Sequence, residues 1–494
     1  MRASVAKTIR SGILGAIASS LCITMSQAQT ANPPLSKTPP MGFNTWNEFQ
    51  CNVSETLLKA VADTMAANGM KAAGYNYVNV DDCWEGARDA NGFISSTNKF
   101  TSSSLKSLAD YVHGKGMKFG AYTSLGDQTC QGKPATLGYE SQDVRQWVNW
   151  GVDYIKVDWC HVNGTQSANP GAAYKVLGDT LKKYAGPSSA RPILYSICNW
   201  GVGKSWTFGR SSGGQIWRTT PDIQPNWASI MSILDQQVDL YSYAGPGAAS
   251  EPGGWNDPDM LEVGNIGSNK DENRAHFGMW CLLSAPLIAG NDVTKMTTDI
   301  RDILINKEVI AVDQDSLGVQ AQRLSSSNQL EVWAKPMMGN CRAVGLLNRS
   351  GSAAMITVNW ADLNKWTTVG TWSTTTSATV RDLWTKADVA SDKSGSYGVS
   401  VPSHGLAILK LTPSDVSDIT FKTSRFDIQG VNYASGLLNI GLPGKYSLQI
   451  LDLNGRVLWR REGSGPSQYV SPVKGDGSHV LRLINPDTKS EIRF

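Results

Sequence analysis

Charged residues and histidine are scarce in this sequence. Asp, Glu, Lys and Arg make up 18% of the 494 residues, below the roughly one quarter that is usual, so long charged helices and coiled coils are not expected. There are only 5 His, and neither an HExxH motif nor a pair of CxxC motifs is present. A zinc site with His or Cys ligands therefore has little support, and we expect neither a metal nor another cofactor.

A basic field is also missing. The formal net charge is +3, but Arg2, Lys7 and Arg10 carry this excess within the first 28 residues, where no acidic residue accompanies them. The rest of the chain therefore has no net formal charge. Nucleic acid is not an expected partner of such a chain.

Long apolar runs are confined to the amino terminus. The first 28 residues combine the positive start with an apolar stretch from Gly12 to Met25 and small residues at Ser26 and Ala28. We interpret residues 1–28 as a secretory signal peptide cleaved after Ala28. No later segment approaches the ~18 apolar residues of a membrane span. We therefore expect a secreted protein, extracellular or periplasmic, without a membrane span; the sequence does not indicate its oligomeric state.

Seven cysteines follow the predicted signal peptide. Export makes disulfides possible, and an odd number leaves at least one thiol unpaired unless a bond forms between chains. The sequence alone does not give the connectivity of these cysteines, which are Cys51, Cys83, Cys130, Cys160, Cys198, Cys281 and Cys341.

Tryptophan is abundant. The 17 Trp are about two to three times the ordinary number for this length. A flat aromatic face suits the apolar face of a sugar ring. A Trp-rich core is the alternative, and it is the favoured interpretation for any single Trp at this point.

Residues 36–315 alternate between short apolar runs and amphipathic stretches. Repeated strand–helix units predict a parallel sheet, and about 280 residues suit a (β/α)8 TIM barrel. The alternative is a doubly wound open sheet, but its usual GxGxxG opening is absent. The predicted strands are Tyr75–Asp82, Met117–Tyr122, Val152–Asp158, Pro192–Cys198, Gln215–Arg218 and Pro286–Ala289, and the clearest helical stretches are Ser54–Asn68, Leu105–Lys115 and Gly171–Tyr184.

The helical pattern fades after the barrel segment. Residues 316–412 contain short apolar runs separated by polar turns, which predicts an antiparallel β-sandwich. The predicted strands are Leu330–Ala334, Ala343–Leu347, Ala354–Trp360, Ala378–Trp384, Tyr397–Val401 and Leu406–Leu411.

A third part follows a predicted linker at Thr412–Asp415. Residues 419–494 are expected to form a small β-module, because Tyr446–Leu453 and Arg456–Trp459 flank an Asn-Gly turn signal. The sequence ILDLNGRVLWRRE resembles small modules that end secreted bacterial enzymes and serve in sorting or surface attachment. An ordinary accessory β-domain is the alternative.

Several acidic residues stand at the ends of predicted strands. Chemistry in barrels occurs at the carboxyl ends of strands, so this set favours a polar site there, although a single acid can also be a helix cap or a solvated loop residue. The acids are Asp81, Asp82, Asp158, Asp222, Asp257 and Asp259.

The central pattern is the strand Tyr154–Asp158. Residues two apart on a strand share a face, so Tyr154, Lys156 and Asp158 point together. A Lys inside a barrel is costly unless paired, and a nearby ammonium keeps a carboxylate ionised, as a nucleophile requires. A Lys–Asp pair that only stabilises the barrel is the alternative.

A second carboxyl is offered by Asp222, which lies between Pro221 and Ile223. Glycoside cleavage uses two carboxyls, one at the anomeric carbon and one that protonates the leaving oxygen. Apolar neighbours suit the raised pKa that such an acid needs. The alternative role of Asp222 is an N-cap for a helix that begins near Pro225.

These residues fall within motifs that resemble those of the alpha-galactosidases of glycoside hydrolase family 27. The resemblance covers about residues 36–411, in order and spacing. The motifs are MGFNTWNEF (Met41–Phe49), NVDDCW (Asn79–Trp84), YIKVDWC (Tyr154–Cys160), YSICNWG (Tyr195–Gly201), WRTTPDI (Trp217–Ile223), GGWNDPDML (Gly253–Leu261) and SAPLIAGND (Ser284–Asp292).

The resemblance implies a retaining exo-glycosidase that acts by double displacement on terminal α-galactosides of oligosaccharides or galactomannan, a carbohydrate substrate. Asp158 resembles the nucleophile and Asp222 the acid/base of the family. Asp81 and Asp82 resemble the carboxylates that hold the O4 and O6 hydroxyls. Retention also predicts that the two catalytic carboxyl groups lie about 5–5.5 Å apart.

The remaining pocket residues follow from the same resemblance. Lys156 resembles the residue that binds O3 and O4, Arg218 and Asp259 the pair near O2, Trp46 the stacking platform and Tyr122 a further pocket residue. Cys198 and Trp200 match the wall near the 2-position, with Cys198 as a thiol. Cys51 with Cys83, and Cys130 with Cys160, resemble the two disulfides of the family's barrel.

Two rival sugars and one rival class remain open. A bulky Trp200 disfavours an N-acetyl group, but Asn199 stands where some relatives carry Glu, which leaves an alpha-N-acetylgalactosaminidase as an alternative. A beta-L-arabinopyranosidase is another, although Asp82 keeps room for the C6 hydroxymethyl group. A lectin-like barrel that binds sugar without cleaving it would usually have lost Asp158 or Asp222, and both are present.

Overall fold

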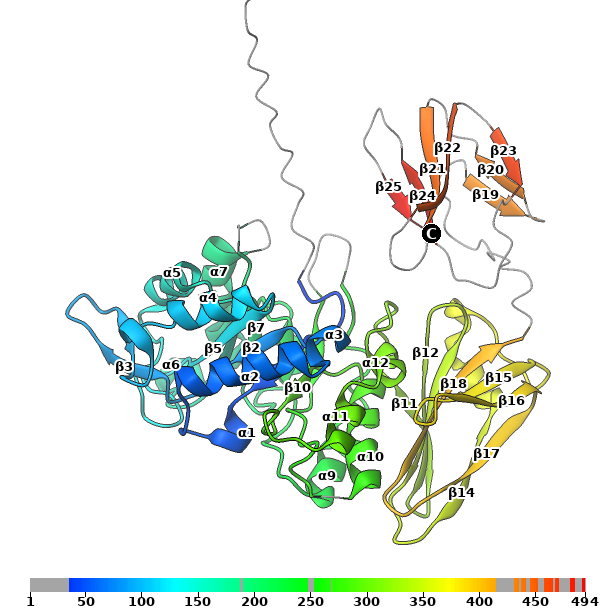
Figure 1. Cartoon of the computed structure of the whole chain (residues 1–494), viewed down its shortest axis with the longest axis horizontal. Helices are drawn as coiled ribbons and strands as arrows, with labels where there is room; N and C mark the ends of the chain where they lie inside the picture. Colours follow the sequence, from blue (N-terminus) through cyan, green and yellow to red (C-terminus); the bar gives the residue numbers. More distant parts are fainter. Residues whose placement is uncertain are drawn as a thin grey trace, which may run out of the picture.

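The computed structural model of the chain describes residues 35–414, except 187, 188, 190, 248–252 and 268, together with seven strands between residues 431 and 493 (Figure 1). The predicted signal peptide, residues 1–28, lies outside the described residues. In Figure 1 a part rich in helices, coloured blue to green, is followed by a part made mainly of strands, coloured yellow.

Eight parallel strands of the first part form one sheet, and their order in space is their order along the chain. They are β1 (Met41–Asn44), β2 (Tyr77–Asn79), β5 (Lys118–Ser124), β6 (Tyr154–Asp158), β7 (Leu194–Cys198), β8 (Ile216–Arg218), β9 (Trp255–Asp257) and β10 (Leu287–Ala289).

The sheet closes into a cylinder. Strand β10 returns to pair with β1. Just beyond β9, the backbone N–H of Leu261 donates to the carbonyl of Ile288 at 2.8 Å, and Leu261 pairs with Ala289 of β10. Both edges of the sheet are thus joined, which confirms the predicted barrel and excludes the open, doubly wound sheet.

Helices follow the strands along the chain. The longer ones are α2 (Glu55–Ala67), α4 (Lys106–Gly114), α5 (Glu140–Trp150), α7 (Pro170–Ala185), α9 (Trp227–Gln237), α10 (Lys270–Leu282), α11 (Thr298–Leu304) and α12 (Lys307–Asp313). Shorter elements are α1 (Trp46–Phe49), α3 (Met70–Ala73), α6 (Gly164–Ser167), α8 (Ser205–Phe208), the 3-10 turn η1 (Thr101–Ser103) and the hairpin of β3 (Glu85–Arg88) and β4 (Ile94–Ser96). The three predicted helical stretches correspond to α2, α4 and α7.

Capping residues fix where several helices begin. The side chain of Ser54 accepts a hydrogen bond from the backbone N–H of Leu57 at the start of α2. Asn169 and Asn226 cap α7 and α9 in the same way. Such side chains satisfy backbone donors that have no partner within the helix, so short polar residues before apolar stretches locate these starts.

The two faces of the barrel strands differ as period-two spacing predicts. Ile155 and Val157 of β6 are fully buried among the apolar residues of the main core. Tyr154 lies instead in a separate apolar cluster with Leu194, Ile216 and other strand residues. Tyr154 and Lys156 line one cavity, and Lys156 and Asp158 line the adjoining pocket, which agrees with the predicted common face.

The second part is a β-sandwich, as predicted. A six-stranded antiparallel sheet has the order β11-β12-β13-β18-β15-β16, and a two-stranded sheet is formed by β14 and β17. The bounds are β11 (Gln322–Ser327), β12 (Leu330–Pro336), β13 (Arg342–Asn348), β14 (Ala354–Asn359), β15 (Ala378–Asp382), β16 (Ala387–Lys393), β17 (Ser396–Val401) and β18 (Leu406–Pro413), with a 3-10 segment η2 (Trp360–Val369) after β14.

Strands β11 and β16 are absent from the sequence-based assignment. They form the two edges of the larger sheet, and most of their residues are exposed or only half-buried. A solvated edge strand does not need the apolar alternation on which the assignment depends. The predicted linker is also partly wrong, because Thr412 and Pro413 belong to β18; Asp415 lies outside the described residues.

The barrel and the sandwich share an apolar interface. Leu347, Leu406 and Ile408 of the sandwich belong to the same buried cluster as Leu282 and Phe277 of α10. Polar contacts accompany it: Arg381 of β15 pairs with Glu308 of α12 at 2.7 Å. A continuous core holds the two parts together, and Figure 1 shows the sandwich beside α10 and α12.

Seven further strands lie in the third part of the chain. They form sheets of three strands, β19-β20-β23, and four strands, β22-β21-β24-β25. The predicted hairpin is present, since Ile450 of β21 pairs with Trp459 of β22 in an antiparallel register. The bounds are β19 (Val431–Ala434), β20 (Leu437–Ile440), β21 (Lys445–Leu451), β22 (Val457–Ser464), β23 (Ser467–Val470), β24 (Val480–Ile484) and β25 (Glu491–Arg493). The domain limits and the sorting role stay predictions.

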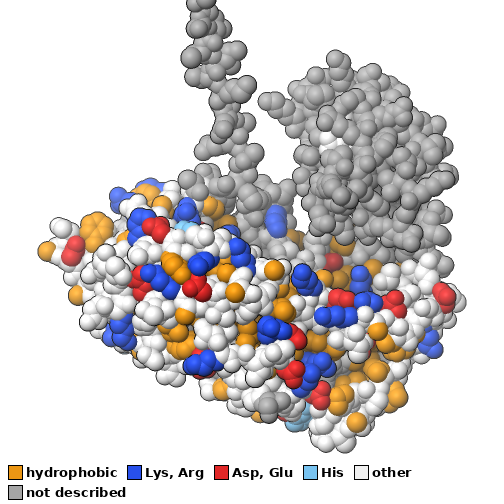
Figure 2. Space-filling view, in the orientation of Figure 1, with side chains coloured by type: hydrophobic (Ala, Val, Ile, Leu, Met, Phe, Trp, Pro, Cys, Tyr) orange, Lys and Arg blue, Asp and Glu red, His pale blue; other side chains and the backbone are white. Residues whose placement is uncertain are grey.

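Figure 2 shows one face of the molecule, on which basic and acidic side chains are interspersed among apolar and other polar ones. Within the described residues, every helix is either too short or too polar to cross a bilayer.

Gly178 tests how closely α7 packs on the barrel. A Cβ at this position would lie 1.8 Å from the backbone oxygen of Ser212, which cannot move without shifting its loop. Although Ala favours helices over Gly, we expect Gly178→Ala to lower the free energy of unfolding by about 1–3 kcal/mol, a typical cost of overpacking. Urea denaturation followed by circular dichroism measures this change.

The matched control is Gly114→Ala, at the last residue of α4. A Cβ at Gly114 meets nothing within 4 Å, so this variant should match the wild type or gain up to about 1 kcal/mol. A Gly178→Ala variant as stable as the Gly114→Ala variant would contradict the packing described here.

Candidate active site

A pocket of about 770 Å³ lies where the loops after the barrel strands meet. Ten of the eleven predicted catalytic and sugar-binding residues line it, namely Trp46, Asp81, Asp82, Tyr122, Lys156, Asp158, Trp200, Arg218, Asp222 and Asp259. The eleventh, Cys198, lines a smaller adjoining cavity together with Lys156, Arg218 and Asp259. The fold therefore brings together residues that are more than two hundred positions apart in the sequence.

Asp158 is the last residue of β6 and is 5% exposed. Its Oδ1 accepts from the backbone N–H of Trp159 at 2.9 Å, and its Oδ2 accepts from the Tyr122 hydroxyl at 3.2 Å. Burial raises the pKa of Asp158 to about 6, although the positive charge of Lys156 and the Trp159 N–H act in the opposite direction. At neutral pH this carboxyl is mostly ionised, with little water around it.

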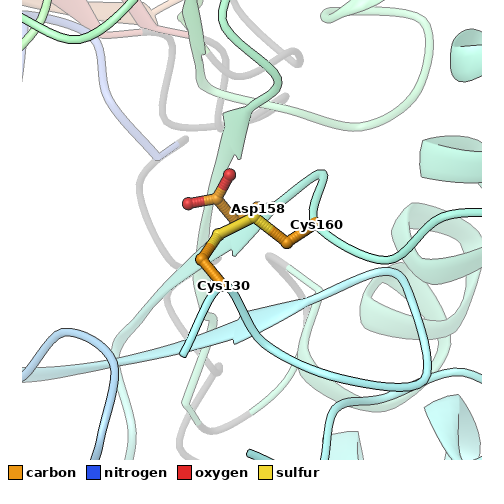
Figure 3. Close-up of side chains that lie close together, drawn as sticks. All are labelled: Cys130, Asp158 and Cys160. Carbon is orange, nitrogen blue, oxygen red and sulfur yellow. A yellow bond between two sulfur atoms is a disulfide. The ribbon is translucent and has the colours of Figure 1, made fainter. Parts of the chain in front are cut away.

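A disulfide lies directly against Asp158, as Figure 3 shows. Cys130 and Cys160 are bonded to each other, and both line the pocket. Their sulfurs and the Asp158 carboxylate lie within 4.8 Å of one another. Because each sulfur is already bonded to the other, this group is a disulfide wall beside the carboxylate and does not offer the thiolates that a metal site needs. Cys51 and Cys83 form the other predicted disulfide.

Asp81 follows β2, is 1% exposed and forms an ion pair with Lys156. The Lys156 ammonium donates to Asp81 Oδ2 at 2.8 Å, and the Asn44 side-chain amide donates to the same oxygen at 2.8 Å. Burial opposes the charge on Lys156, but the negative charges of Asp81 and Asp158 outweigh it and hold the pKa of Lys156 well above the ordinary value. The direct partner of Lys156 is thus Asp81, which follows β2. Lys156 therefore influences the ionisation of Asp158 by its charge and not by an ion pair.

Asp82 is also buried, and the protein holds its carboxylate on both oxygens. Its Oδ1 accepts from the backbone N–H of Cys83 at 2.7 Å and from the Thr129 hydroxyl at 2.8 Å, and its Oδ2 accepts from the N–H of Gln131 at 3.0 Å. Burial raises the pKa of Asp82, the Thr129 hydrogen bond lowers it, and the neighbouring charge of Asp81 raises it further. These fixed donors orient one carboxylate toward the pocket.

Asp222 lies in the loop after β8, and its side chain is 61% exposed. The Arg218 guanidinium donates to Asp222 Oδ1 at 2.9 Å and to Asp259 Oδ2 at 2.7 Å. The apolar surroundings expected for Asp222 are therefore wrong: the carboxyl is open to solvent beside an arginine. The helix-cap alternative is also wrong, because Asn226 caps α9.

Asp259 and Trp200 have backbone conformations that are unusual for residues with a side chain. Their φ angles are +90° and +56°, in the left-handed region. Asp259 is held there by backbone N–H donors, from Met260 to Oδ1 at 2.7 Å and from Ile223 to Oδ2 at 2.9 Å. Such conformations persist where the surroundings over-determine them, and they gather at functional sites.

The tryptophans divide between core and pocket. Trp46 and Trp200 are half-buried and line the pocket. The core interpretation holds for most of the others, since Trp84, Trp147, Trp217, Trp255, Trp280, Trp333, Trp360 and Trp372 are fully buried.

Asp257, one of the acids expected at the strand ends, lines the small cavity beside Lys156, and burial raises its pKa to about 6. The structure also reveals two site residues that sequence reasoning missed, Asn44 and Glu262; Asn44 donates to Asp81. Glu262 lines the main pocket and is 2% exposed. Its signal in the sequence is an acidic residue within the otherwise apolar run Met260–Val263.

The arrangement has a definite chemical meaning. Two carboxyls line one pocket, Asp158 at the end of β6 and Asp222 in the loop after β8, and glycoside cleavage uses such a pair. Further carboxylates, a Lys, an Arg and two Trp surround them, and such groups bind a ring with many hydroxyls. A closed barrel with this site at its strand ends is the architecture of a glycoside hydrolase.

Comparison with known proteins also points to a glycoside hydrolase and specifies the family. The family profile described as alpha galactosidase A matches residues 38–315, and the alpha galactosidase C-terminal beta sandwich domain matches residues 327–411. Alpha-galactosidase A of Cellvibrio japonicus (strain Ueda107) is 41% identical over 414 residues, which are 80% of this chain and 97% of the relative. The alpha-galactosidase of Cyamopsis tetragonoloba is 43% identical over 383 residues, covering 77% of this chain and 87% of the relative.

A solved structure agrees with these relatives. Alpha-galactosidase I from Mortierella vinacea superposes with a TM-score of 0.71 at 37% identity, covering 78% of this chain and 99% of that chain. The chain belongs to the alpha-galactosidase (melibiase) family.

Burial of Asp158 has a measurable cost in stability. Its pKa rises from 3.8 to about 6 on folding, so the folded state binds more protons than the unfolded state between these values, and the free energy of unfolding falls as pH rises through them. We expect Asp158→Asn to be more stable than the wild type at pH 7, by about 1–3 kcal/mol, and the gain to vanish near pH 4. Urea denaturation at both pH values measures it.

The control is Asp179→Asn, which changes an exposed carboxylate of α7 paired with Lys175. The difference in free energy of unfolding between this variant and the wild type should stay below about 0.5 kcal/mol at both pH values. An Asp158→Asn variant that is less stable than the wild type at pH 7 would contradict the dominance of burial over pairing at this residue.

Proposed function

We propose that the protein is a retaining exo-glycosidase that removes terminal α-D-galactosyl residues from oligosaccharides or galactomannan. The observation that carries this proposal is that the buried Asp158 and the exposed Asp222 line the same pocket. Tyr122 donates a hydrogen bond to Asp158, and Arg218 donates one to Asp222. One carboxyl suits a nucleophile and the other a group that exchanges protons with solvent.

In the first step, Asp158 Oδ attacks the anomeric carbon while the bond to the leaving oxygen breaks. Asp222 donates its proton to that oxygen, so the aglycone departs as an alcohol and a β-galactosyl ester of Asp158 forms. In the second step, Asp222 takes a proton from water, the water oxygen attacks the anomeric carbon, and the ester breaks to return Asp158. Two inversions give α-galactose.

The environment of Asp158 supports its role as nucleophile. Tyr122 and the N–H of Trp159 fix the carboxylate in position, and a pKa of about 6 leaves it ionised at neutral pH. Few water molecules need to leave so buried an oxygen before it attacks. Positioning and electrostatic preorganisation of this kind lower the barrier of the chemical step.

The environment of Asp222 supports proton exchange. Its side chain is open to water in the free protein, which suits a group that must give up and regain a proton in every turnover. Arg218 touches both Asp222 and Asp259, and therefore couples the acid to the wall assigned to O2 of the sugar.

Asp81, Asp82 and Lys156 support galactose as the sugar. Galactose differs from glucose by its axial O4. Two adjacent carboxylates that accept from O4 and O6 would recognise this difference, because a sugar lacking the right hydroxyl leaves a buried charge without its partner. Lys156, already bonded to Asp81 at 2.8 Å, offers a donor to the O3 and O4 oxygens from the same side.

The rival sugars are less well accommodated. Trp200 lines the pocket and, by the family resemblance, stands at the wall near the 2-position, where a bulky side chain disfavours an N-acetyl group. The short side chain of Asp82 is fixed by Thr129 and Gln131, and this leaves room for the hydroxymethyl group of galactose that arabinopyranose lacks.

We also propose that the chain is exported. The two disulfides of the described residues are typical of an oxidising compartment, and residues 1–28 have the composition of a signal peptide.

Hydrolysis of three aryl glycosides, compared side by side, tests the proposal. The sugars are α-D-galactose, N-acetyl-α-D-galactosamine and β-L-arabinopyranose. We expect kcat/KM for the galactoside to exceed both others by at least about tenfold, because each rival leaves buried polar groups unpaired or meets the Trp200 wall. Proton NMR during the first turnovers should show α-galactose before mutarotation.

Asp158→Asn serves as the control and should lose turnover of the galactoside. A preference for either rival sugar would overturn the assignment of substrate. First-formed β-galactose would overturn the retaining mechanism.

A further inference from the structure

Glu262 is a buried carboxyl of the pocket that has no part in the steps described above. It lies in the loop after β9, three residues beyond Asp259, and is 2% exposed. Its Oε2 accepts from the side-chain amide of Asn265 at 2.6 Å, and its Oε1 accepts from the side-chain amide of Asn47. Both oxygens are therefore held by neutral donors on opposite sides.

These donors stand on different elements. Asn265 belongs to the same loop as Glu262, and its amide also donates to the carbonyl of Gly290 after β10, at 3.2 Å. Asn47 belongs to α1, beside Trp46. Glu262 thus links the loop of the seventh barrel strand to the loop of the first, across the strand that lies between them.

The loop that carries Glu262 is firmly anchored. The backbone N–H of Glu262 donates to His276 Nε2 of α10 at 2.9 Å, and the indole N–H of Trp280 donates to the carbonyl of Asp259 at 2.8 Å. Burial lowers the pKa of His276 to about 3, so this ring is neutral and accepts the hydrogen bond over the whole working range of pH.

Helix α1 has only four residues, and its N-cap, Thr45, makes no side-chain capping bond. Its start is held from β1 and β2, because the Trp46 N–H donates to Asn44 Oδ1 at 2.8 Å and the Thr45 hydroxyl accepts from the Asp81 N–H at 2.9 Å. The Cys51–Cys83 disulfide ties the chain just beyond its end. The middle of α1 is held through Asn47, which packs so closely on Gly290 that a Cβ there would lie 3.1 Å from the Asn47 Cβ.

We propose that Glu262 is a positioning residue, which fixes the Trp46 platform for the sugar ring by anchoring α1 through Asn47. This inference rests on the proposed function, in which Trp46 stacks on the sugar. A carboxylate suits the task because it accepts on both oxygens at once, whereas an alcohol or an apolar side chain leaves the Asn47 and Asn265 donors unpaired.

The electrostatics of Glu262 agree with this geometry. Burial raises its pKa to about 7, and the nearby charges of Asp259 and Glu48 act in the same direction, while the Asn265 and Asn47 amides oppose them. The two amides therefore stabilise the ionised form of Glu262, in which both oxygens accept hydrogen bonds. A side chain retained only to fill space would gain nothing from this costly burial.

The test is a double-mutant cycle on hydrolysis of an aryl α-galactoside. A loosened platform weakens binding of substrate and transition state alike, so Glu262→Ala should raise KM by about fivefold or more and change kcat by less than about threefold. If Glu262 acts through Trp46, the same substitution in a Trp46→Ala background should change KM by less than about twofold. Asn47→Ala should reproduce the effect of Glu262→Ala.

The isosteric Glu262→Gln variant should retain KM within about threefold of the wild type, because its amide can bond to both asparagines once one of them turns over. An unchanged KM in Glu262→Ala, or an equal rise in the Trp46→Ala background, would overturn the inference. Wild-type protein without activity on the galactoside would refute the proposed function instead. If Glu262→Ala does not fold, Asn47→Ala with and without Trp46→Ala decides the question.

Discussion

The ion pair between Lys156 and Asp81 is the interaction on which the rest of the pocket depends. Asp81 is fully buried and Lys156 nearly so, and their charged atoms lie 2.8 Å apart. Removal of either group would leave the other as an uncompensated charge inside the barrel, which is strongly destabilising. With the pair in place, the positive charge of Lys156 lowers the cost of ionising Asp158, two residues further along the same strand β6. On the other side of the pocket, Arg218 pairs with both Asp222 and Asp259, and its charge opposes the rise that burial causes in the pKa of Asp259.

Covalent links then hold the loops that carry these charges. Cys83 directly follows Asp82, and its disulfide to Cys51 joins the loops after β2 and β1. Cys160 lies two residues after Asp158, and its disulfide to Cys130 joins the loops after β6 and β5. The pocket wall is thus built from neighbouring loops tied in pairs, and its carboxylates stay close together despite their mutual repulsion.

The same crowding explains why the site reduces stability while it supports chemistry. Burial raises the pKa of Asp158, Asp257 and Glu262 above their ordinary values, so each carboxyl destabilises the folded state at neutral pH. The barrel core and its continuous interface with the sandwich supply the apolar burial that offsets this cost. These carboxyls serve the proposed chemistry although they lower the stability of the folded state, a trade-off that is common at catalytic sites.

Much of the fold and site could be predicted from sequence, because some signals are local. The period-two pattern of Tyr154–Asp158 places Lys156 and Asp158 on one face, and acids at strand ends meet at one rim of any parallel barrel. The motifs shared with the family add the residues that lie far apart in the chain.

Other features depend on contacts that no local pattern encodes. The partner of Lys156 is set by the packing of neighbouring strands, the exposure of Asp222 by the course of its loop, and the link from Glu262 to Asn47 by closure of the barrel. Strands β11 and β16 escaped notice because solvated edges carry no apolar alternation.

The central claim is that Asp158 and Asp222 act on one sugar from opposite sides, the first as nucleophile and the second as acid/base. Azide and an activated aryl α-galactoside test it most directly when they are given to Asp158→Gly and Asp222→Gly. Without Asp158, azide must attack the anomeric carbon itself, and the account predicts β-galactosyl azide. Without Asp222, azide instead displaces Asp158 from the ester, and the account predicts α-galactosyl azide. The opposite pair of anomers, or an Asp158→Gly variant with wild-type turnover, would contradict the account.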